Sequence, residues 1–312
     1  MTTGDAGAVD GTGTAGADGA ATVAGAAGGA LPAVRAVRVA ESPACELAES
    51  PRLSPSGRSL WFIDIEAARV WRVAATELGN RAAYESLQLP QLPGFVIPES
   101  DSSALLGLAD GLYRLHWEGA QLARVWELPG AAVPVRINDG ALAPDGAVWF
   151  GTMNLGEGDP DAGLLFRYAE GVARVVDGPV ACWNGIVFDA CDAAVLATDT
   201  LGREIRRYGR DGDRGASIAV PGPGRAGLPD GLWLAPDGSL WSAIWDAGEV
   251  LVLRGGAPAS AVLTPGMRPT AIAGLPDGGV VITLAADAAG PGGLAVLEAA
   301  GVAEVLGLAH ES

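Results

Sequence analysis

The residues A-P-D-G-A-V-W-F-G-T at positions 143–152 return as A-P-D-G-S-L-W-S-A-I-W at positions 235–245. Each copy joins a turn sequence containing Pro, Asp and Gly to a short, mainly apolar strand. Four more copies keep this order of turn and strand: S-P-S-G-R-S-L-W-F-I-D from Ser54, I-P-E-S-D-S-S-A-L-L-G from Ile97, D-A-C-D-A-A-V-L-A-T-D from Asp189 and L-P-D-G-G-V-V-I-T-L from Leu275. The chain therefore repeats one unit six times.

The spacing of these copies predicts the fold. Their second residues stand at positions 55, 98, 144, 190, 236 and 276, which gives intervals of 40 to 46 residues. Each unit also has a short apolar stretch before the turn and usually another strand after it. Three or four short strands per unit, repeated six times, are typical of β-propeller blades. We predict an all-β, six-bladed β-propeller over residues 34–312, with the strand at 33–40 pairing with the last blade to close the ring.

Residues 1–33 have a different composition. They are almost entirely Gly, Ala, Thr and Asp, with no Leu, Ile or aromatic residue before Leu31. Such a segment buries too little apolar surface to offset its ordering entropy, so we predict a disordered N-terminal tail. It lacks the charged and Leu-rich regions of a signal peptide, and no stretch of the chain predicts a transmembrane helix. We expect a cytoplasmic protein with no membrane partner.

Charge and composition exclude several kinds of chemistry. The formal net charge is -17, so the phosphate backbone of a nucleic acid would be repelled. All 20 basic residues are Arg, which excludes lysine nucleophiles. The only histidines, His116 and His310, are poorly placed for a catalytic triad, and a carboxylate is the expected general base. The cysteines have no CxxC spacing, and we interpret them as small buried apolar residues.

One position in the repeat is polar in most of the units. Six residues before the second residue of each copy, the chain has in turn Glu49, Leu92, Asn138, Asn184, Asp230 and Thr270. The strand before the turn is the innermost of its blade, so these residues begin the six strands around the central channel. Each alone resembles an ordinary turn residue, since P-D-G occurs at three other places. Their common register favours one shared site.

The chemistry of this ring suits a hard divalent cation. Glu49 and Asp230 supply carboxylates, and Asn138 and Asn184 supply amide oxygens. Calcium is the first choice for such ligands, and magnesium or manganese is the alternative. Arg136 stands two residues before Asn138, so strand alternation sends its side chain to the same side, where it either holds a substrate oxygen or pairs with a neighbouring carboxylate.

The roles of Trp183 and of Arg136 each leave two alternatives open. Trp183 either forms a wall of the site or belongs to the core. Asp139 is the carboxylate with which Arg136 would pair if its role were structural.

The motifs around these residues resemble the SMP-30/gluconolactonase family, which includes regucalcin and bacterial sugar lactonases. The resemblance runs from about Cys45 through the sixth blade. Its marks are L-A-E-S-P-R-L at 47–53, R-I-N-D-G at 136–140 with W-F-G-T-M at 149–153, W-N-G at 183–185 and L-P-D-G-L at 228–232. It implies a metal-dependent lactonase that takes a small-molecule, sugar-derived lactone.

The resemblance also implies a role for each residue. Glu49, Asn184 and Asp230 would bind the metal, which in this family is calcium, zinc, magnesium or manganese. Asp230 would also act as general base toward water, or serve only as a ligand. Arg136 and Asn138 match positions that contact the substrate. Some members carry a substrate-binding Glu three residues after G-T-M; that position is Gly156 here, and Glu157 follows it.

Other functions are compatible with the same residues. The chain could be a metal-binding or ligand-sensing propeller without activity. It could also be a related propeller that hydrolyses aryl esters or organophosphates. The sequence does not predict the oligomeric state.

Overall fold

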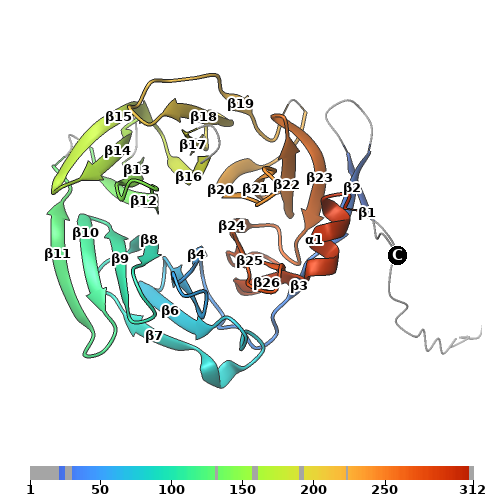
Figure 1. The fold of residues 1–312 in the computed structure, drawn as a ribbon, viewed down its shortest axis with the longest axis horizontal. Coiled ribbons are helices and arrows are strands. Elements are labelled where there is room, and N and C mark those ends of the chain that lie inside the picture. Colours follow the sequence, from blue (N-terminus) through green and yellow to red (C-terminus); the bar gives the residue numbers. More distant parts are fainter. Residues whose placement is uncertain are drawn as a thin grey trace, which may run out of the picture.

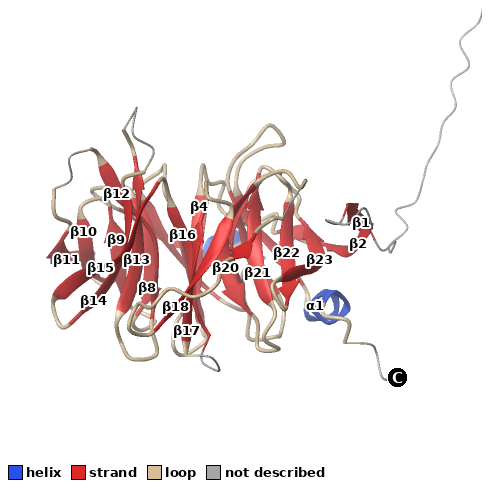
Figure 2. Cartoon of the chain, turned by 90° about the horizontal axis from the view of Figure 1, so that it is seen from above, coloured by secondary structure: helices blue, strands red, loops and turns tan. Residues whose placement is uncertain are grey.

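The apolar and polar residues of the repeat alternate because each strand packs one side against the next blade. The computed structural model describes residues 21–24, 30–130, 133–156, 161–189, 193–222 and 224–308. Six antiparallel sheets surround a central opening, which confirms the six-bladed β-propeller (Figure 1). Seen from the side, the blades form a disc whose strands run between two faces (Figure 2). No helix in these ranges is long and apolar enough to span a membrane.

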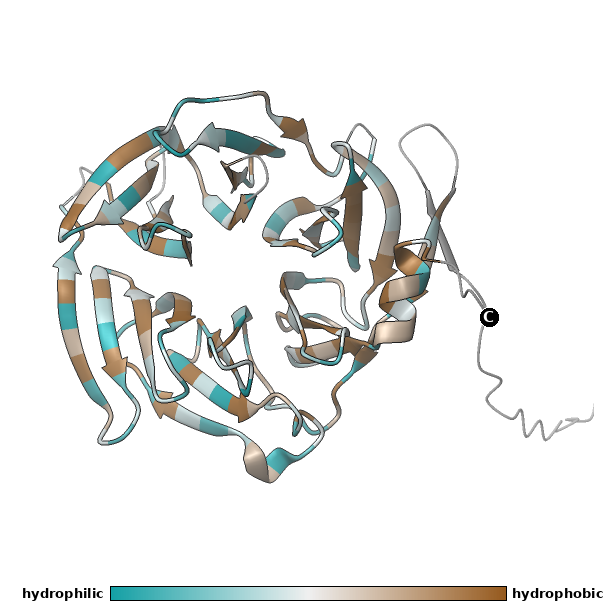
Figure 3. Cartoon of the chain, viewed as in Figure 1, coloured by the Kyte–Doolittle hydropathy of each residue, from teal (hydrophilic) through white to brown (hydrophobic). Residues whose placement is uncertain are grey.

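The first three blades have four strands each, running in chain order from the channel outward. Their bounds are β4 (Ala48–Leu53), β5 (Ser59–Asp64), β6 (Arg69–Ala74) and β7 (Glu85–Gln88), then β8 (Pro93–Pro98), β9 (Ser103–Leu108), β10 (Gly111–His116) and β11 (Gln121–Glu127), then β12 (Val135–Leu142), β13 (Val148–Asn154), β14 (Gly163–Ala169) and β15 (Val172–Val180). A 3-10 turn, η1 (Arg81–Ala83), precedes β7. Brown and teal bands alternate along outer strands such as β11 (Figure 3).

The last three blades follow the same order. Their bounds are β16 (Trp183–Asp189), β17 (Ala194–Asp199), β18 (Glu204–Gly209) and β19 (Ile218–Ala219), then β20 (Leu228–Leu234), β21 (Leu240–Trp245), β22 (Glu249–Arg254) and β23 (Ala257–Leu263), then β24 (Pro269–Gly274), β25 (Val280–Leu284) and β26 (Gly293–Leu297). We call the face at which the innermost strands begin the upper face. The face that carries the turns after them is the lower face.

The sixth blade is completed by the N-terminal part of the chain. Strand β3 (Val37–Arg38) pairs antiparallel with β26, which confirms the predicted pairing with the last blade for this part of the strand at 33–40. Residues 33–35 pair with β23 of the fifth blade instead. A second link joins the innermost strands of the last and first blades. The buried Thr270 hydroxyl donates to the carbonyl oxygen of Ala48 at 2.6 Å and lies 2.8 Å from the Thr283 hydroxyl. The ring is therefore closed at its rim and at its channel.

Two strands lie at the predicted boundary between tail and propeller. Strand β2 (Ala30–Arg35) begins inside the predicted tail and pairs in parallel with β23, and β1 (Ala21–Ala24) pairs with β2. Leu31 and the buried Ala33 pack in the apolar cluster of the fifth blade, and this burial supports β2 despite its small residues. A short helix, α1 (Ala299–Val305), packs beside it. The remainder of the predicted tail lies outside the described residues.

The turns of the lower face explain most of the P-D-G tripeptides. Asp145, Asp237 and Asp277 each accept the backbone N–H two residues later, at 2.9–3.0 Å. The glycine between has a positive φ of 83° to 87°, which favours Gly over any residue with a Cβ. The strand after the turn then buries a tryptophan in three of the blades. These are Trp61, Trp149 and Trp241, each at most 1% exposed.

The threonine link between the first and last blades predicts a loss of stability in Thr270→Val. Valine matches threonine in shape but leaves the Ala48 carbonyl without its donor, so we expect a loss of about 1–3 kcal/mol. Urea unfolding followed by circular dichroism measures it. The control is Thr76→Val, at an exposed threonine, which should stay within about 0.5 kcal/mol. Equal effects of the two substitutions would contradict a closing role for the Thr270 hydroxyl.

Candidate active site

All six innermost strands are irregular at the same level, near the upper face. Their pairing with the second strand of the blade shifts register between Glu49 and Arg52, Pro93 and Phe95, Ile137 and Asp139, Asn184 and Ile186, Pro229 and Leu232, and Pro269 and Ile272. Such bulges turn side chains away from the regular alternation and are common beside active sites. Here they lie where the sequence predicts the polar ring.

An open cavity of ≈ 690 Å³ lies at this level of the channel. Five predicted site residues line it: Glu49, Arg136, Asn138, Asn184 and Asp230. They come from the first, third, fourth and fifth blades and are all at least nine-tenths buried.

The other predicted residues lie elsewhere. Leu92 precedes β8 and packs in an apolar cluster, because the bulge of the second blade lies between Pro93 and Phe95, after the predicted position. Thr270 closes the ring, as described above. Trp183 is fully buried, with the Arg206 guanidinium 5.0 Å above its ring, so it belongs to the core. Glu157 and His310 lie outside the described residues.

Glycines let the innermost strands approach one another at the ring. A Cβ on Gly185 would lie 2.5 Å from the carbonyl oxygen of Asp230, and one on Gly231 would lie 2.5 Å from that of Thr270. The tripeptide at 229–231 is therefore not a turn: its glycine permits contact between blades and its aspartate lines the cavity. The sequence P-D-G therefore forms turns at the lower face and, at 229–231, lies in a strand that lines the cavity.

Negative charge accumulates beneath the cavity. Burial and the charge of Asp139 raise the pKa of Glu49 to about 8. Burial and the charges of Glu49 and Asp139 raise the pKa of Asp230 well above its ordinary value. Asp139 is itself 3% exposed, and burial raises its pKa as well. Three carboxylates thus lie close enough to repel one another in a medium of low polarity.

The cationic side chains nearby offset this charge only in part: Arg52 and Arg136 lower the pKa of Glu49, but burial outweighs them. Asp139 has only Arg52, with 3.9 Å between the two charged groups. Arg136 does not pair with Asp139; its Nη1 donates to the backbone carbonyl of Ile137 at 3.0 Å. Within the described ranges, neither Glu49 nor Asp230 forms an ion pair. Asp139, which adjoins Asn138, was not predicted from the sequence to act on the site, yet its charge raises the pKa of Glu49 and Asp230.

Hydrogen bonds fix the two amides of the ring. Asn138 donates its amide N–H to the Trp183 carbonyl of the next blade at 3.0 Å, which leaves its Oδ1 to accept. Asn184 donates to the Asp230 carboxylate, and its Oδ1 accepts the Gly185 N–H at 3.2 Å. Both amide oxygens are therefore oriented by the protein rather than by a ligand.

A thiol also lines the cavity. From the sequence, Cys182 was expected to be a small buried apolar residue, and no sulfur was expected at the site. In the structure Cys182 lines the cavity. Burial and the charge of Asp230 raise its pKa to about 12, so it remains a neutral thiol at neutral pH. Its position two residues before Asn184 is the feature of the sequence that places it on the same side of the strand as that residue.

These residues fit a hard cation. Two carboxylates and two amide oxygens face one cavity, and a divalent ion would remove the repulsion among the buried charges. No group of three His, Cys, Asp or Glu side chains in the described ranges is arranged to hold a metal. A cation would therefore depend on Asn184 in addition to Glu49 and Asp230.

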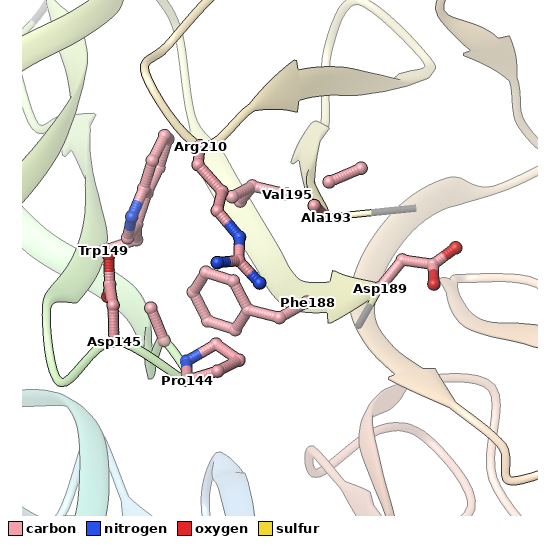
Figure 4. Close-up of a pocket in the computed structure, with 10 residues that line it drawn as sticks. Pro144, Asp145, Trp149, Phe188, Asp189, Ala193, Val195 and Arg210 are labelled. Carbon is pink, nitrogen blue, oxygen red and sulfur yellow. The ribbon is translucent and has the colours of Figure 1, made fainter. Parts of the chain in front are cut away.

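A smaller hollow of ≈ 320 Å³ opens between the third and fourth blades at the lower face (Figure 4). Trp149 and Phe188 form its walls, and Arg210 lies over it. Asp145 in its rim pairs with Arg167 and caps its own turn. No predicted site residue lines this hollow, so the cavity of the upper face is the better candidate.

Comparison with known proteins gives three kinds of likeness. Residues 47–285 match the family model described as the SMP-30/Gluconolactonase/LRE-like region. A 6-deoxy-6-sulfogluconolactonase of Pseudomonas putida is 32% identical over 212 residues, 66% of this chain and 71% of its own. A pentonolactonase of Haloferax volcanii is 30% identical over 217 residues, 67% and 70%. The structure of a calcium-binding protein, regucalcin, of Agrobacterium tumefaciens has a TM-score of 0.75 at 23% identity, covering 85% of this chain and 94% of that one.

The contact between blades at Gly185 predicts a steric effect. In Gly185→Ala the new methyl group meets the Asp230 carbonyl, so we expect a loss of about 1–3 kcal/mol in the free energy of unfolding. Gly79→Ala is the control, because nothing lies within 4 Å of its Cβ. Denaturant titrations of both variants test this. A Gly185→Ala variant as stable as Gly79→Ala would show that the inner strands can separate freely.

Proposed function

The chain belongs to the SMP-30/gluconolactonase/LRE-like family, and we propose that it is an enzyme that opens small lactones by attack of water at the cavity of the upper face. The observation that carries this proposal is the open cavity at which the buried carboxylates of Glu49 and Asp230, neither of them in an ion pair within the described ranges, meet Arg136 and two amide side chains. The relatives named as a sulfogluconolactonase and a pentonolactonase support lactones as the substrate class.

We assign one divalent cation to Glu49, Asn184 and Asp230. Calcium is our first choice because the ligands are all oxygens; a regucalcin with this fold is a calcium-binding protein. Zinc, magnesium and manganese are the alternatives. A cation held there would supply a Lewis acid for the lactone carbonyl.

The protein side chains supply orientation and proton transfer. The guanidinium of Arg136 retains donors for the lactone oxygens, because only Nη1 is used by Ile137. Asn138 Oδ1 can accept a substrate hydroxyl or the attacking water. Asp230 takes a proton from that water as the new C–O bond forms. The ring C–O bond then breaks, and the proton passes to the departing alkoxide.

Asp230 has two proposed roles that differ in their consequences. As a base it removes the proton of water. As a ligand it only holds the cation, and cation binding would lower its basicity. Glu157 follows the position at which some family members carry a substrate-binding Glu, and we propose it as a substrate contact. A cytoplasmic location is likewise a proposal.

Removal of the cation should abolish activity and lower stability. We expect EDTA to stop hydrolysis of a lactone panel, and calcium to restore it. Calcium at a hundred times its dissociation constant should add about 2.7 kcal/mol to the free energy of unfolding. Glu49→Gln should reduce this increment, whereas Glu118→Gln, in an exposed turn, should keep it. Stability and hydrolysis that ignore both EDTA and calcium would contradict the cation site.

The panel also separates the enzyme from its alternatives. It includes paraoxon and phenyl acetate beside the lactones. Cation binding without hydrolysis of any of these compounds would favour a ligand-sensing propeller. Hydrolysis of the aryl ester or the organophosphate alone would favour the related propeller hydrolases.

Substitution of Asp230 distinguishes base from ligand. Asp230→Asn should lower kcat by about 10²–10⁴ if the carboxylate moves a proton. Calcium affinity, measured by calorimetry, assigns the cause: an inactive variant with normal affinity supports the base, and one with greatly weakened affinity supports a ligand. The control is Asp211→Asn, in an exposed turn. An active, calcium-loaded Asp230→Asn would exclude the base assignment.

A further inference from the structure

The cavity has two levels with different chemistry. The lower level consists of Glu49, Asn138, Asn184 and Asp230. Two residues earlier in each of these chain segments, alternation places a second set of side chains one step nearer the upper face, and all of them line the cavity: Leu47, Arg136, Cys182 and Leu228. Polar oxygens thus form the floor, and three of the four positions above it are apolar or weakly polar.

The second strands of the blades extend this apolar level. Ile65 follows β5 and donates its backbone N–H to the Leu47 carbonyl at 2.9 Å. Trp245 ends β21 directly opposite Leu228. Met153 lies beside Cys182 across the third and fourth blades. Met153, Leu228 and Trp245 therefore belong to paired strands, and Leu47 and Cys182 form single β-bridges beside them.

Few polar groups remain at this level for a substrate. Arg136 already donates to the Ile137 carbonyl. The Thr200 hydroxyl lines the cavity beside the Cys182 thiol. An aldonolactone carries several hydroxyl groups, and each one buried without a partner weakens binding. Among the described residues that line this level, the indole N–H of Trp245 is the one further side-chain donor of a strong hydrogen bond.

Part of the surface beyond the cavity is apolar, beside an exposed ion pair of Arg268 and Asp246 on the same face. Leu155, Leu201 and Met267 lie on loops of the upper face, and each is more than half exposed. These loops follow β13, β17 and β23, so they surround the same end of the channel. An apolar substituent that leaves the cavity would continue along apolar surface.

We propose that the substrate is a lactone with an apolar alkyl substituent, seated against Leu47, Leu228 and Trp245, rather than a polyhydroxylated sugar lactone. This inference rests on the proposed lactone hydrolysis and names its substrate class. The ester group lies at the polar floor, beside Arg136 and Asp230. The substituent points toward the upper face.

The test keeps the ring constant and changes the substituent. The full chain is incubated with calcium and, in turn, with δ-hexalactone, δ-octalactone, δ-decalactone and glucono-δ-lactone. A pH indicator follows the release of acid, and the rates are corrected for spontaneous opening. We expect kcat/KM to rise about threefold to fourfold per methylene, or about a hundredfold from δ-hexalactone to δ-decalactone. Glucono-δ-lactone should be the poorest substrate of the four.

A variant of the apolar level tests the location. Leu228→Asn should lower the ratio of kcat/KM for δ-decalactone to that for δ-hexalactone about tenfold. Loss of folded protein would lower both values and leave the ratio unchanged. Leu142→Asn, at an exposed leucine of the lower face, is the matched control and should keep the ratio.

The outcomes separate this inference from the proposed function. Efficient opening of glucono-δ-lactone with no gain along the alkyl series would overturn the inference and support lactone hydrolysis. A ratio that Leu228→Asn does not change would also overturn it. Hydrolysis of none of the four compounds would contradict the proposed function and, with it, the inference.

Discussion

The repulsion among Glu49, Asp139 and Asp230 is the constraint on which the centre of this molecule depends. Three carboxylates do not stay together in an apolar interior unless the backbone holds them there. The propeller does this by taking each one from a different blade and fixing it at a bulge near the start of an innermost strand. Glycines at 185 and 231 bring the strands close enough for the charges to interact. The fold therefore confines charge that the site then uses.

The repeat predicted the blades because turn and strand recur with a regular period. The ring was predicted for four of its six positions, since Glu49, Asn138, Asn184 and Asp230 share one register. The prediction was wrong for Leu92, because the bulge of the second blade lies between Pro93 and Phe95, after that residue. Strand β2 was missed because its support comes from packing against a distant blade, which local composition cannot reveal.

The remaining residues of the site show what a single sequence conceals. Asp139 and Cys182 each had an ordinary explanation, as a surface ion-pair partner and as a small core residue. Their roles depend on depth, which the register alone does not give: one lies beneath the cavity and the other in its wall. The apolar level above the floor was readable only after the floor was located. The cavity thus has carboxylate and amide side chains at its floor and mainly apolar side chains above them.

The closing strand has a consequence for biosynthesis. Strand β3 leaves the ribosome before the first blade, and its partner β26 leaves it only after the first five blades. Until β26 appears, the sixth sheet has no place for β3, and the ring keeps an open edge. The incomplete ring is therefore vulnerable to aggregation until β26 pairs with β3 and closes it.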